Sequence, residues 1–423
     1  MQRAAAVRNQ CGNGKMQRGS LRRFMRMRVS RSLCAAAVAL LASAAAAPPP
    51  PLPRLDIIGP ASASGISSGA DLAPMLHIAY SDVFFASGAF AGQAYGCAVH
   101  AFDGEPREAC AAQPASQRGP GCVGLASTGA APCEGCGAAG TTVAYDHCKK
   151  TPAIIQVARL QRWAEAAAAR GDIAPLARLR EARVYTYRGT RDSVYLPGCV
   201  NQTGAFFAPY VAQPQRQILF EAGVPSQHSQ PSIDPAVPRD SCGNYTIGGM
   251  QNCGYDGVGA MLQHFYDNAL SAPPAGATAD PARLLNFSQD AYGNASAQFG
   301  GLATTGFAYI PARCAPGAAQ PCRVHVALHG CGQSYVTPRQ GLLYPLLGGY
   351  APWADANGFV MLFVQGGGFA ERGWSTPAAQ VMAACHDAYG QTGAAFAWRG
   401  GAVLSAIRAM LVALGGEGFW LRR

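Results

Sequence analysis

The chain is short of charged residues, and acidic side chains are absent from its first 47 positions. Charged residues make up 13% of the 423 residues, and the formal net charge at pH 7 is +10. Residues 1–47 hold nine arginines and lysines and no acid, so the rest of the chain carries a net charge of about +1. A net charge of about +1 is too small for a basic surface that binds nucleic-acid phosphates. We therefore expect no nucleic-acid partner.

In residues 1–47, which we call the leader, no apolar run is long enough to predict a membrane-spanning helix. The run at 33–47 is short and rich in alanine, and it follows a basic region that ends at Arg31. A basic region, an apolar run and the small residues of "ASAAAAPPPP" are typical of a signal peptide, which we place at 1–47. The alternative is a disordered cytosolic tail. We therefore expect a secreted or periplasmic protein with no stable membrane insertion, and a proline-rich spacer at 48–54.

Cysteine patterns that bind metals are scarce. One Cys-x-x-Cys pair, Cys133 and Cys136, stands without a second such pair. We expect no metal and no cofactor, although the pair leaves metal or redox chemistry as an alternative. Thirteen of the fifteen cysteines lie beyond the leader, and six of these fall in 97–148, which we interpret as a Cys-rich insertion. In an exported protein such usage predicts disulfides, with one thiol left over.

The region 55–423 shows no internal repeat and no appended domain, so a single domain is expected. "RVHVALHGCGQ" (323–333) and "GFVMLFVQGGG" (358–368) are nearly continuous apolar runs that break at glycine, as buried parallel strands do. A further strand is predicted within 182–192, and apolar density falls in the loop-rich 196–245. Helices are expected around 153–169, 256–267, 350–358 and 400–416. This alternation predicts an α/β fold, a mostly parallel sheet with helices on both faces.

The stretch "SASGISSGADLAP" (62–74) lies between the apolar segment Leu55–Ile58, expected as a strand, and a helix-like segment. Residues 65–69 fit G-x-S-x-G, the turn that lifts a nucleophilic serine above a sheet and needs glycines where side chains would collide with backbone. We expect Ser67 to be the nucleophile and the Ser68 amide to face the developing oxyanion. The alternative is an ordinary glycine-rich turn.

A nucleophilic serine needs a base and an acid that orients the base. Asp192 follows the predicted strand in "VYTYRGTRDSV", although it could be a turn aspartate beside Arg191. His228 lies in a long loop, "GVPSQHSQPS", and the order Ser67, Asp192, His228 is the chain order of α/β-hydrolases. The other histidines fit worse: His77, His264 and His325 fall in predicted helices or strands, and His100, His147 and His386 lie beside cysteines.

The second oxyanion donor of an α/β-hydrolase comes from a loop after a strand that precedes the nucleophile. Here almost nothing structured precedes residue 55, and the matching segment, "HVALHGCGQ", comes after His228. We interpret the chain as a circularly permuted α/β-hydrolase whose early strands come from 323–331 and 358–364. The amide of Cys331 would then complete the oxyanion hole.

These residues carry a family resemblance. The chain resembles the circularly permuted catalytic domains of poly(3-hydroxybutyrate) depolymerases in collinear blocks across roughly 55–415. The blocks are "GISSGADLAPMLHIAYSDVF", "VYTYRGTRDSV", "QHSQPS", "NCGYDGVGAMLQHFY", "FAYIPARC", "CRVHVALHGCGQ" and "WADANGFVMLFVQ". The resemblance implies Ser67, Asp192 and His228 as the triad and the amides of Ser68 and Cys331 as the oxyanion hole.

Departures from the family concern the substrate surface. Where the family has an aromatic C-W-D-W-W-G-Y-T-G segment, this chain has "CHDAYGQTG" (385–393), with His386, Ala388 and Tyr389 in place of tryptophans. We expect Tyr389 and His329 to contact the substrate. Alongside the resemblance, the cysteine pairs we expect are Cys97–Cys148, Cys242–Cys253, Cys314–Cys322, Cys331–Cys385 and two bridges among Cys110, Cys122, Cys133 and Cys136, with Cys199 free.

The sequence thus predicts an exported, monomeric serine esterase that hydrolyses poly(3-hydroxybutyrate) or related hydroxyalkanoate oligomers through an acyl-enzyme. Two alternatives stay open. A carboxylesterase or feruloyl-type esterase acting on plant polymers would use the same triad. A non-catalytic polyester-binding protein on a decayed hydrolase fold would tolerate the altered tryptophans.

Overall fold

Eight strands form one sheet at the centre of the computed structural model, in the order β4-β3-β2-β1-β9-β10-β8-β7. The structure describes residues 49–97, 148–150, 152, 155–244, 249–293, 301–338, 340–368, 384–388, 390, 392 and 395–422. The sheet strands are β1 (Ala61–Ile66), β2 (Phe84–Phe90), β3 (Arg183–Tyr187), β4 (Ile218–Glu221), β7 (Leu284–Ser288), β8 (Thr305–Tyr309), β9 (Arg323–Leu328) and β10 (Phe359–Val364). Two short strands, β5 (Gln230–Pro231) and β6 (Met250–Gln251), pair separately.

The sheet is parallel from β4 through β10 and antiparallel at its other edge. β1 pairs in parallel with both β2 and β9, whereas β8 runs antiparallel to β10 and to β7. The first strand of the chain therefore lies in the middle, beside strands from the C-terminal third. This is the order that circular permutation of an α/β-hydrolase requires, and we keep the permutation as our interpretation of it.

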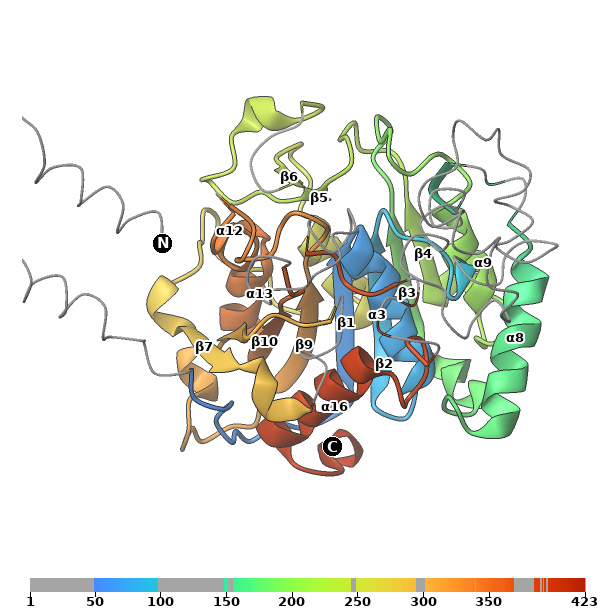
Figure 1. Ribbon diagram of the computed structural model, residues 1–423. Helices are drawn as coiled ribbons and strands as arrows, with labels where there is room; N and C mark the ends of the chain where they lie inside the picture. The colour runs from blue at the N-terminus through green and yellow to red at the C-terminus, as the bar shows by residue number, and fades with distance from the viewer. Residues whose placement is uncertain are drawn as a thin grey trace, which may run out of the picture. The chain divides into compact units, whose positions relative to one another are not determined.

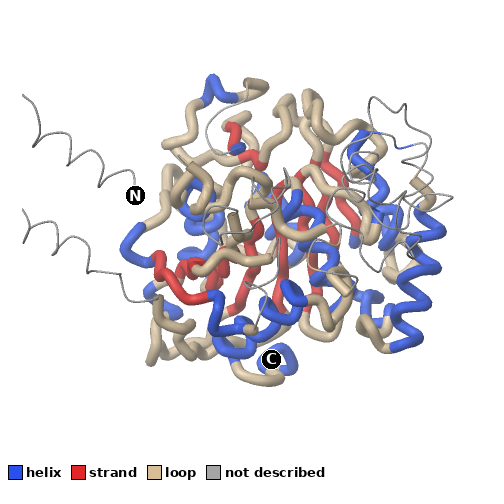
Figure 2. The backbone as a smooth tube through the Cα atoms, viewed as in Figure 1, coloured by secondary structure: helices blue, strands red, loops and turns tan. Residues whose placement is uncertain are grey.

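The helices cover both faces of the sheet (Figures 1 and 2). One apolar core cluster joins the sheet to α3 (Ser68–Ala79), α8 (Val157–Arg170), α9 (Asn201–Phe207) and α16 (Ala402–Gly415). The other joins it to α11 (Gly257–Phe265), α12 (Leu343–Leu347) and α13 (Tyr350–Asn357). A short helix, α10 (Pro214–Gln217), leads into β4, and short 3₁₀ helices lie at 176–181, 239–241, 281–283, 289–292, 312–314 and 419–421.

Side chains of the central strands alternate between the two clusters. In β10, Val360 and Leu362 pack in the first cluster, whereas Met361 and Phe363 pack in the second. Because both faces are covered, all six residues of this strand are buried, and the strand is an uninterrupted apolar run. The predicted α/β fold with a mostly parallel sheet and helices on both faces is confirmed.

The strand before Ser67 was predicted in the wrong place. Leu55–Ile58 makes only an isolated bridge, Ile57 to Cys322, and β1 is built instead from the small residues of the glycine–serine stretch. Small side chains are needed there because the neighbouring backbone is very close: a Cβ on Gly65 would lie 2.5 Å from the Leu328 carbonyl oxygen. Steric fit, rather than hydrophobicity, decides this strand.

The segment expected to be loop-rich, 196–245, also contains regular elements. It holds α9, α10 and the edge strand β4, whose Leu219 and Phe220 are exposed. β4 has only four residues, so its apolar run is too short to stand out in the sequence. The antiparallel pair β7–β8 was not predicted from the apolar runs either.

Pro49–Arg423 forms one compact unit. The expected signal peptide and most of the Cys-rich insertion lie outside the described residues, so their boundaries stay predictions. The structure does contain the four predicted disulfides: Cys97–Cys148, Cys242–Cys253, Cys314–Cys322 and Cys331–Cys385. Cys199, expected to be the free thiol, is buried and belongs to none of these four disulfides. Cys110, Cys122, Cys133 and Cys136 fall outside the described residues.

Candidate active site

Ser67 occupies a strained turn between β1 and α3. Its φ of 56° and ψ of −122° lie outside the favoured regions for a residue with a side chain, and its amide donates to the Phe90 carbonyl at the end of β2. Gly69 faces the end of β9 so closely that a Cβ would overlap the Leu328 carbonyl. These are the features that the G-x-S-x-G pattern predicts for a nucleophile elbow.

Asp192 lies in a turn after β3, and its carboxylate is held by backbone and side-chain donors. Oδ1 accepts hydrogen bonds from the amides of Val194 at 2.8 Å and Tyr195 at 2.9 Å. Oδ2 accepts one from His228 Nδ1 at 3.0 Å. The carboxylate is therefore fixed in orientation, and it holds the imidazole in the tautomer that leaves Nε2 without a proton.

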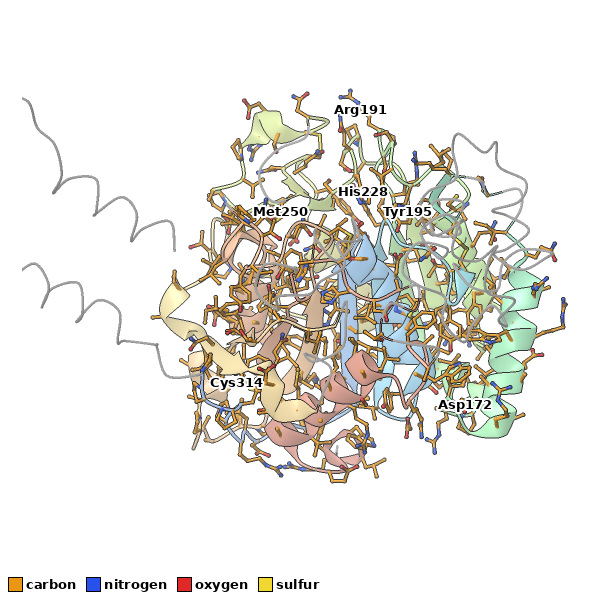
Figure 3. The ribbon with its side chains drawn as sticks, viewed as in Figure 1. Asp172, Arg191, Tyr195, His228, Met250 and Cys314 are labelled. Atoms are coloured by element: carbon orange, nitrogen blue, oxygen red, sulfur yellow. A yellow bond between two sulfur atoms is a disulfide. The ribbon has the colours of Figure 1, made fainter. Side chains whose placement is uncertain are left out.

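His228 is fixed from a second direction by Tyr195. The two rings stack with centroids 5.4 Å apart and an interplanar angle of 6°, and Figure 3 shows both residues at one end of the sheet. The Tyr195 hydroxyl donates to Asp71 Oδ2 at 3.0 Å, and the Asp71 amide donates to the carbonyl of Ser67. These contacts tie the histidine to the first turn of α3, where Ser67 lies.

The hydrogen bond that the structure gives to the His228 ring is the one to Asp192. Catalytic hydrogen bonds often tighten only in the substrate complex. A contact between His228 Nε2 and Ser67 Oγ is therefore part of the mechanism proposed below. The catalytic roles of Ser67, Asp192 and His228 stay a proposal on that account.

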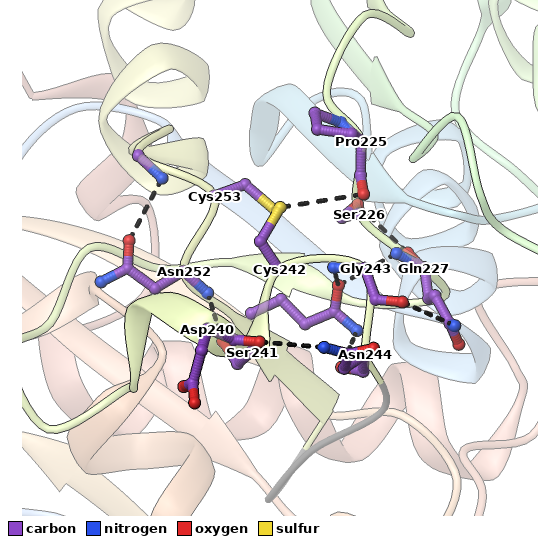
Figure 4. Close-up of a disulfide and its surroundings, with 12 residues drawn as sticks. Pro225, Ser226, Gln227, Asp240, Ser241, Cys242, Gly243, Asn244, Asn252 and Cys253 are labelled. Atoms are coloured by element: carbon purple, nitrogen blue, oxygen red, sulfur yellow. Dashed lines mark hydrogen bonds between the residues drawn. A yellow bond between two sulfur atoms is a disulfide. The ribbon is translucent and has the colours of Figure 1, made fainter.

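The loop that carries His228 is held by a clamp of amide groups and a disulfide. Gln251 Oε1 accepts from the amides of Gln227 at 3.0 Å and Gly243 at 3.1 Å, and Gln227 Nε2 donates to the Gly243 carbonyl at 2.8 Å. The Cys242–Cys253 disulfide closes the neighbouring segment, which contains Gly243 and Gln251 (Figure 4). Sequence reasoning missed both Gln251 and Tyr195, since each acts through contacts that only the folded chain creates.

The two proposed oxyanion donors lie on neighbouring segments. Ser68 begins α3, where backbone N–H groups point out of the helix end. Cys331 follows β9, which pairs with β1 so that Leu328 lies opposite Gly65. Next to Cys331, a Cβ on Gly330 would lie 3.0 Å from Ser67 Cβ. The backbone of this loop therefore approaches the elbow closely, and the Cys331–Cys385 disulfide fastens it.

His329 is buried, and both of its ring nitrogens bind backbone groups. Nδ1 donates to the Gly330 carbonyl at 2.8 Å, and Nε2 accepts from the Gly366 amide at 2.9 Å. Burial lowers the pKa of His329 to about 4, so the ring is neutral near pH 7. In this structure the ring fixes the loop after β9, which carries Cys331; its expected contact with substrate stays a prediction. Tyr389, the other expected substrate contact, lies outside the described residues.

His386 packs on His329, with ring centroids 4.4 Å apart. Its backbone amide donates to Ser68 Oγ at 3.2 Å, so His386 adjoins the first residue of α3. Burial, and to a smaller extent His329, lower its pKa well below the ordinary value. The position at which the resemblance implies tryptophan is therefore occupied here by a neutral, buried imidazole.

The remaining described histidines have structural partners, as predicted. His77 hydrogen-bonds Ser87 at 3.0 Å, His264 bonds the Gln217 carbonyl at 3.0 Å, and His325 lies between Ser62 and Ser64. Among the described residues, no group of three or more potential ligand side chains is placed to hold a metal ion. Nor is any helix in that part of the chain long and apolar enough to cross a membrane.

Comparisons with known proteins point to one family. No protein-family model matches the chain. A poly(3-hydroxybutyrate) depolymerase of Delftia acidovorans is 28% identical over 83% of this chain and 58% of its own length. A polyhydroxybutyrate depolymerase of Talaromyces funiculosus is 29% identical over 72% of this chain and 74% of its own length.

Solved structures agree. A serine-to-alanine variant of PHB depolymerase in complex with an R3HB trimer is 25% identical, with a TM-score of 0.66. PHB depolymerase from Penicillium funiculosum is 26% identical, with a TM-score of 0.65. Each comparison covers 86% of this chain and 98% of the solved chain. The chain thus spans a little over half of the Delftia protein but nearly all of these structures.

Proposed function

Because the chain belongs to the poly(3-hydroxybutyrate) depolymerase family, we propose that it is an exported serine esterase that cleaves 3-hydroxybutyrate oligomers or the amorphous polymer. The observation that carries the proposal is the hydrogen bond between His228 Nδ1 and Asp192 Oδ2, beside a serine elbow. The R3HB trimer bound to a related structure supports a short polyester chain as substrate.

The reaction proceeds in two halves. His228 Nε2 takes the proton from Ser67 Oγ as the oxygen attacks the ester carbonyl, while Asp192 stabilises the imidazolium. The amides of Ser68 and Cys331 stabilise the tetrahedral oxyanion. Collapse of this intermediate breaks the ester C–O bond, and the leaving alcohol takes the proton from His228. A water molecule then attacks the acyl-enzyme with the same base, which releases the 3-hydroxy acid and restores Ser67.

Export rests on different observations from the chemistry. Four disulfides lie within the described residues, and such bonds persist in oxidising compartments. Together with the leader at 1–47, they support a secreted or periplasmic enzyme. We propose a monomer that needs no nucleic acid, metal or cofactor. Light scattering of the purified protein tests the monomer.

Product analysis tests the proposed substrate. Incubation with amorphous poly(3-hydroxybutyrate) and with the R-3-hydroxybutyrate trimer should release 3-hydroxybutyrate and short oligomers, and Ser67→Ala should release none. Feruloyl and acetyl sugars in parallel reactions distinguish the alternative esterase. Faster hydrolysis of those sugars would reject the polyester assignment while retaining the triad. An absence of hydrolysis with every ester would favour the non-catalytic polyester-binding protein.

A further inference from the structure

A buried polar network lies under the proposed active site. It reaches the three backbone segments that carry Ser67, Cys331 and His228. Its members are Ser64, Gln230, His325, Tyr344 and Tyr350, which we call the Gln230 network. Each side chain is at most 1% exposed. Polar groups buried this completely are costly to leave unpaired, so a satisfied network fixes the relative positions of the elements that it joins.

The first branch reaches the strand that carries the nucleophile. Ser64 Oγ lies 2.8 Å from the Tyr350 hydroxyl and 2.8 Å from His325 Nε2. Ser64 is in β1, three residues before Ser67, and His325 is in the neighbouring strand β9. Burial lowers the pKa of His325 to about 3, so the ring joins the network as a neutral group.

The second branch reaches the loop after β9, which carries Cys331. The Tyr344 hydroxyl donates to the Leu328 carbonyl at 3.0 Å and lies 3.2 Å from the Tyr350 hydroxyl. Leu328 ends β9, three residues before Cys331. The loop that supplies the second proposed amide is thereby connected to the same pair of tyrosines.

The third branch reaches the loop of the base. Gln230 Oε1 lies 3.3 Å from the hydroxyls of both Tyr344 and Tyr350, and Gln230 Nε2 donates to the Gly348 carbonyl at 2.7 Å. Gln230 lies two residues after His228, in β5. One amide side chain therefore joins the histidine loop to both of the other segments.

We propose that Gln230, Tyr344 and Tyr350 are positioning residues. They hold the backbones of Ser67, Cys331 and His228 in the relative positions that acyl transfer needs. This inference rests on the proposed function, because it assumes the catalytic roles of Ser67, Cys331 and His228. None of the three positioning side chains touches the reacting atoms. Their effect should appear in the chemical step, since small displacements of catalytic groups slow the reaction strongly.

Tyr350→Phe tests the inference, because it removes one hydroxyl and little volume. We expect kcat for the R-3-hydroxybutyrate trimer to fall by on the order of tenfold or more, with KM changed by less than about twofold. The rate of fluorophosphonate labelling of the serine should fall in proportion. Tyr344→Phe is judged by the same criteria and decides the matter if Tyr350→Phe does not fold.

Tyr309→Phe is the matched control. Tyr309 is equally buried and belongs to the same core cluster, but its hydroxyl bonds Asp355 at 2.8 Å and the Asp280 amide at 3.3 Å, away from the three segments. The Tyr309→Phe variant should lower the midpoint of urea unfolding about as much as Tyr350→Phe does. It should nevertheless keep kcat and the labelling rate within about twofold of wild type.

Two results overturn the inference: Tyr350→Phe that labels as fast as wild type, or Tyr309→Phe that loses as much activity as Tyr350→Phe. Labelling does not require a polyester. If wild type labels but does not hydrolyse the trimer, the proposed substrate is wrong and the inference is still decided by the labelling rates. If wild type does not label, the proposed function and this inference both fail.

Discussion

His228 Nδ1 donates a hydrogen bond to Asp192 Oδ2 at 3.0 Å, across 36 positions of sequence. The carboxylate is buried and also accepts two backbone amides, so it cannot rotate away from the ring. The stacked Tyr195 ring limits the imidazole further. These contacts leave Nε2 as the His228 nitrogen that can accept a proton, and the predictions that follow depend on this arrangement.

Asp192→Asn should keep the fold and lower kcat by on the order of 10⁴-fold, as the corresponding change does in Ser-His-Asp enzymes. An asparagine amide can donate to Nδ1, which favours the tautomer with the proton on Nε2, where it cannot accept from serine. Steady-state kinetics with the trimer measure the effect, and circular dichroism checks the fold. Activity within tenfold of wild type would show that Asp192 is a turn residue only.

The Cys242–Cys253 disulfide should affect activity as well as stability. Its loop spans 11 residues, so its removal by double substitution to serine should cost about 3 kcal/mol of unfolding free energy in the loop-entropy model. Because Gly243 and Gln227 share the Gln251 clamp, we also expect kcat to fall.

The Cys314–Cys322 pair provides the control for that experiment. Its loop spans 8 residues, and Figure 3 shows Cys314 at the end of the sheet opposite His228. Its double substitution should cost a similar free energy and leave kcat unchanged. Equal losses of kcat in the two variants would show that the clamp has no particular link to the base.

Acid should destabilise the protein before its carboxylates titrate. Burial lowers the pKa of His77 and His325 to about 3 and of His329 to about 4, below the ordinary value of 6.5, and lowers that of His386 as well. The unfolded chain therefore binds more protons than the folded chain below pH 6.5. Stability present at neutral pH should be lost as the pH falls, by up to about 1.4 kcal/mol per pH unit for each histidine.

Urea unfolding at several values from pH 6.5 to pH 5 measures this slope. His77→Phe should reduce the slope, because it removes one buried histidine whose pKa is lowered; the ring packs against Phe207, with centroids 5.4 Å apart. A stability that is flat across this interval would mean that the histidines are protonated in the folded state.

How far the sequence predicts this molecule depends on whether a feature is local. The elbow at Ser67 is readable because the backbone itself demands glycine at 65 and 69, and the strands at 323–328 and 359–364 are readable because burial on both faces makes them apolar. The strand before the serine was misplaced, since Ala61–Ile66 is selected for small size and not for hydrophobicity. A hydropathy pattern does not report how closely small side chains fit against neighbouring backbone.

The sequence pointed to Asp192 and His228, which the structure brings into hydrogen-bond contact, but not to the residues that support them. Chain order and loop placement pointed to Asp192 and His228. Tyr195, Gln230 and Gln251 are polar or aromatic residues outside the apolar runs, and nothing local sets them apart from surface positions. Their importance arises from contacts with segments that are distant in sequence, as the bond between Tyr344 and Gln230 shows.

Fluorophosphonate labelling followed by peptide mapping tests the central claim most directly, because only an activated serine reacts. We predict one adduct per chain, on the peptide that contains Ser67, with no adduct in Ser67→Ala and a much slower reaction in His228→Ala. Hydrolysis of the trimer should fall by on the order of 10⁴-fold or more in Ser67→Ala. An adduct on another serine, or hydrolysis that survives the loss of Ser67, would contradict the account.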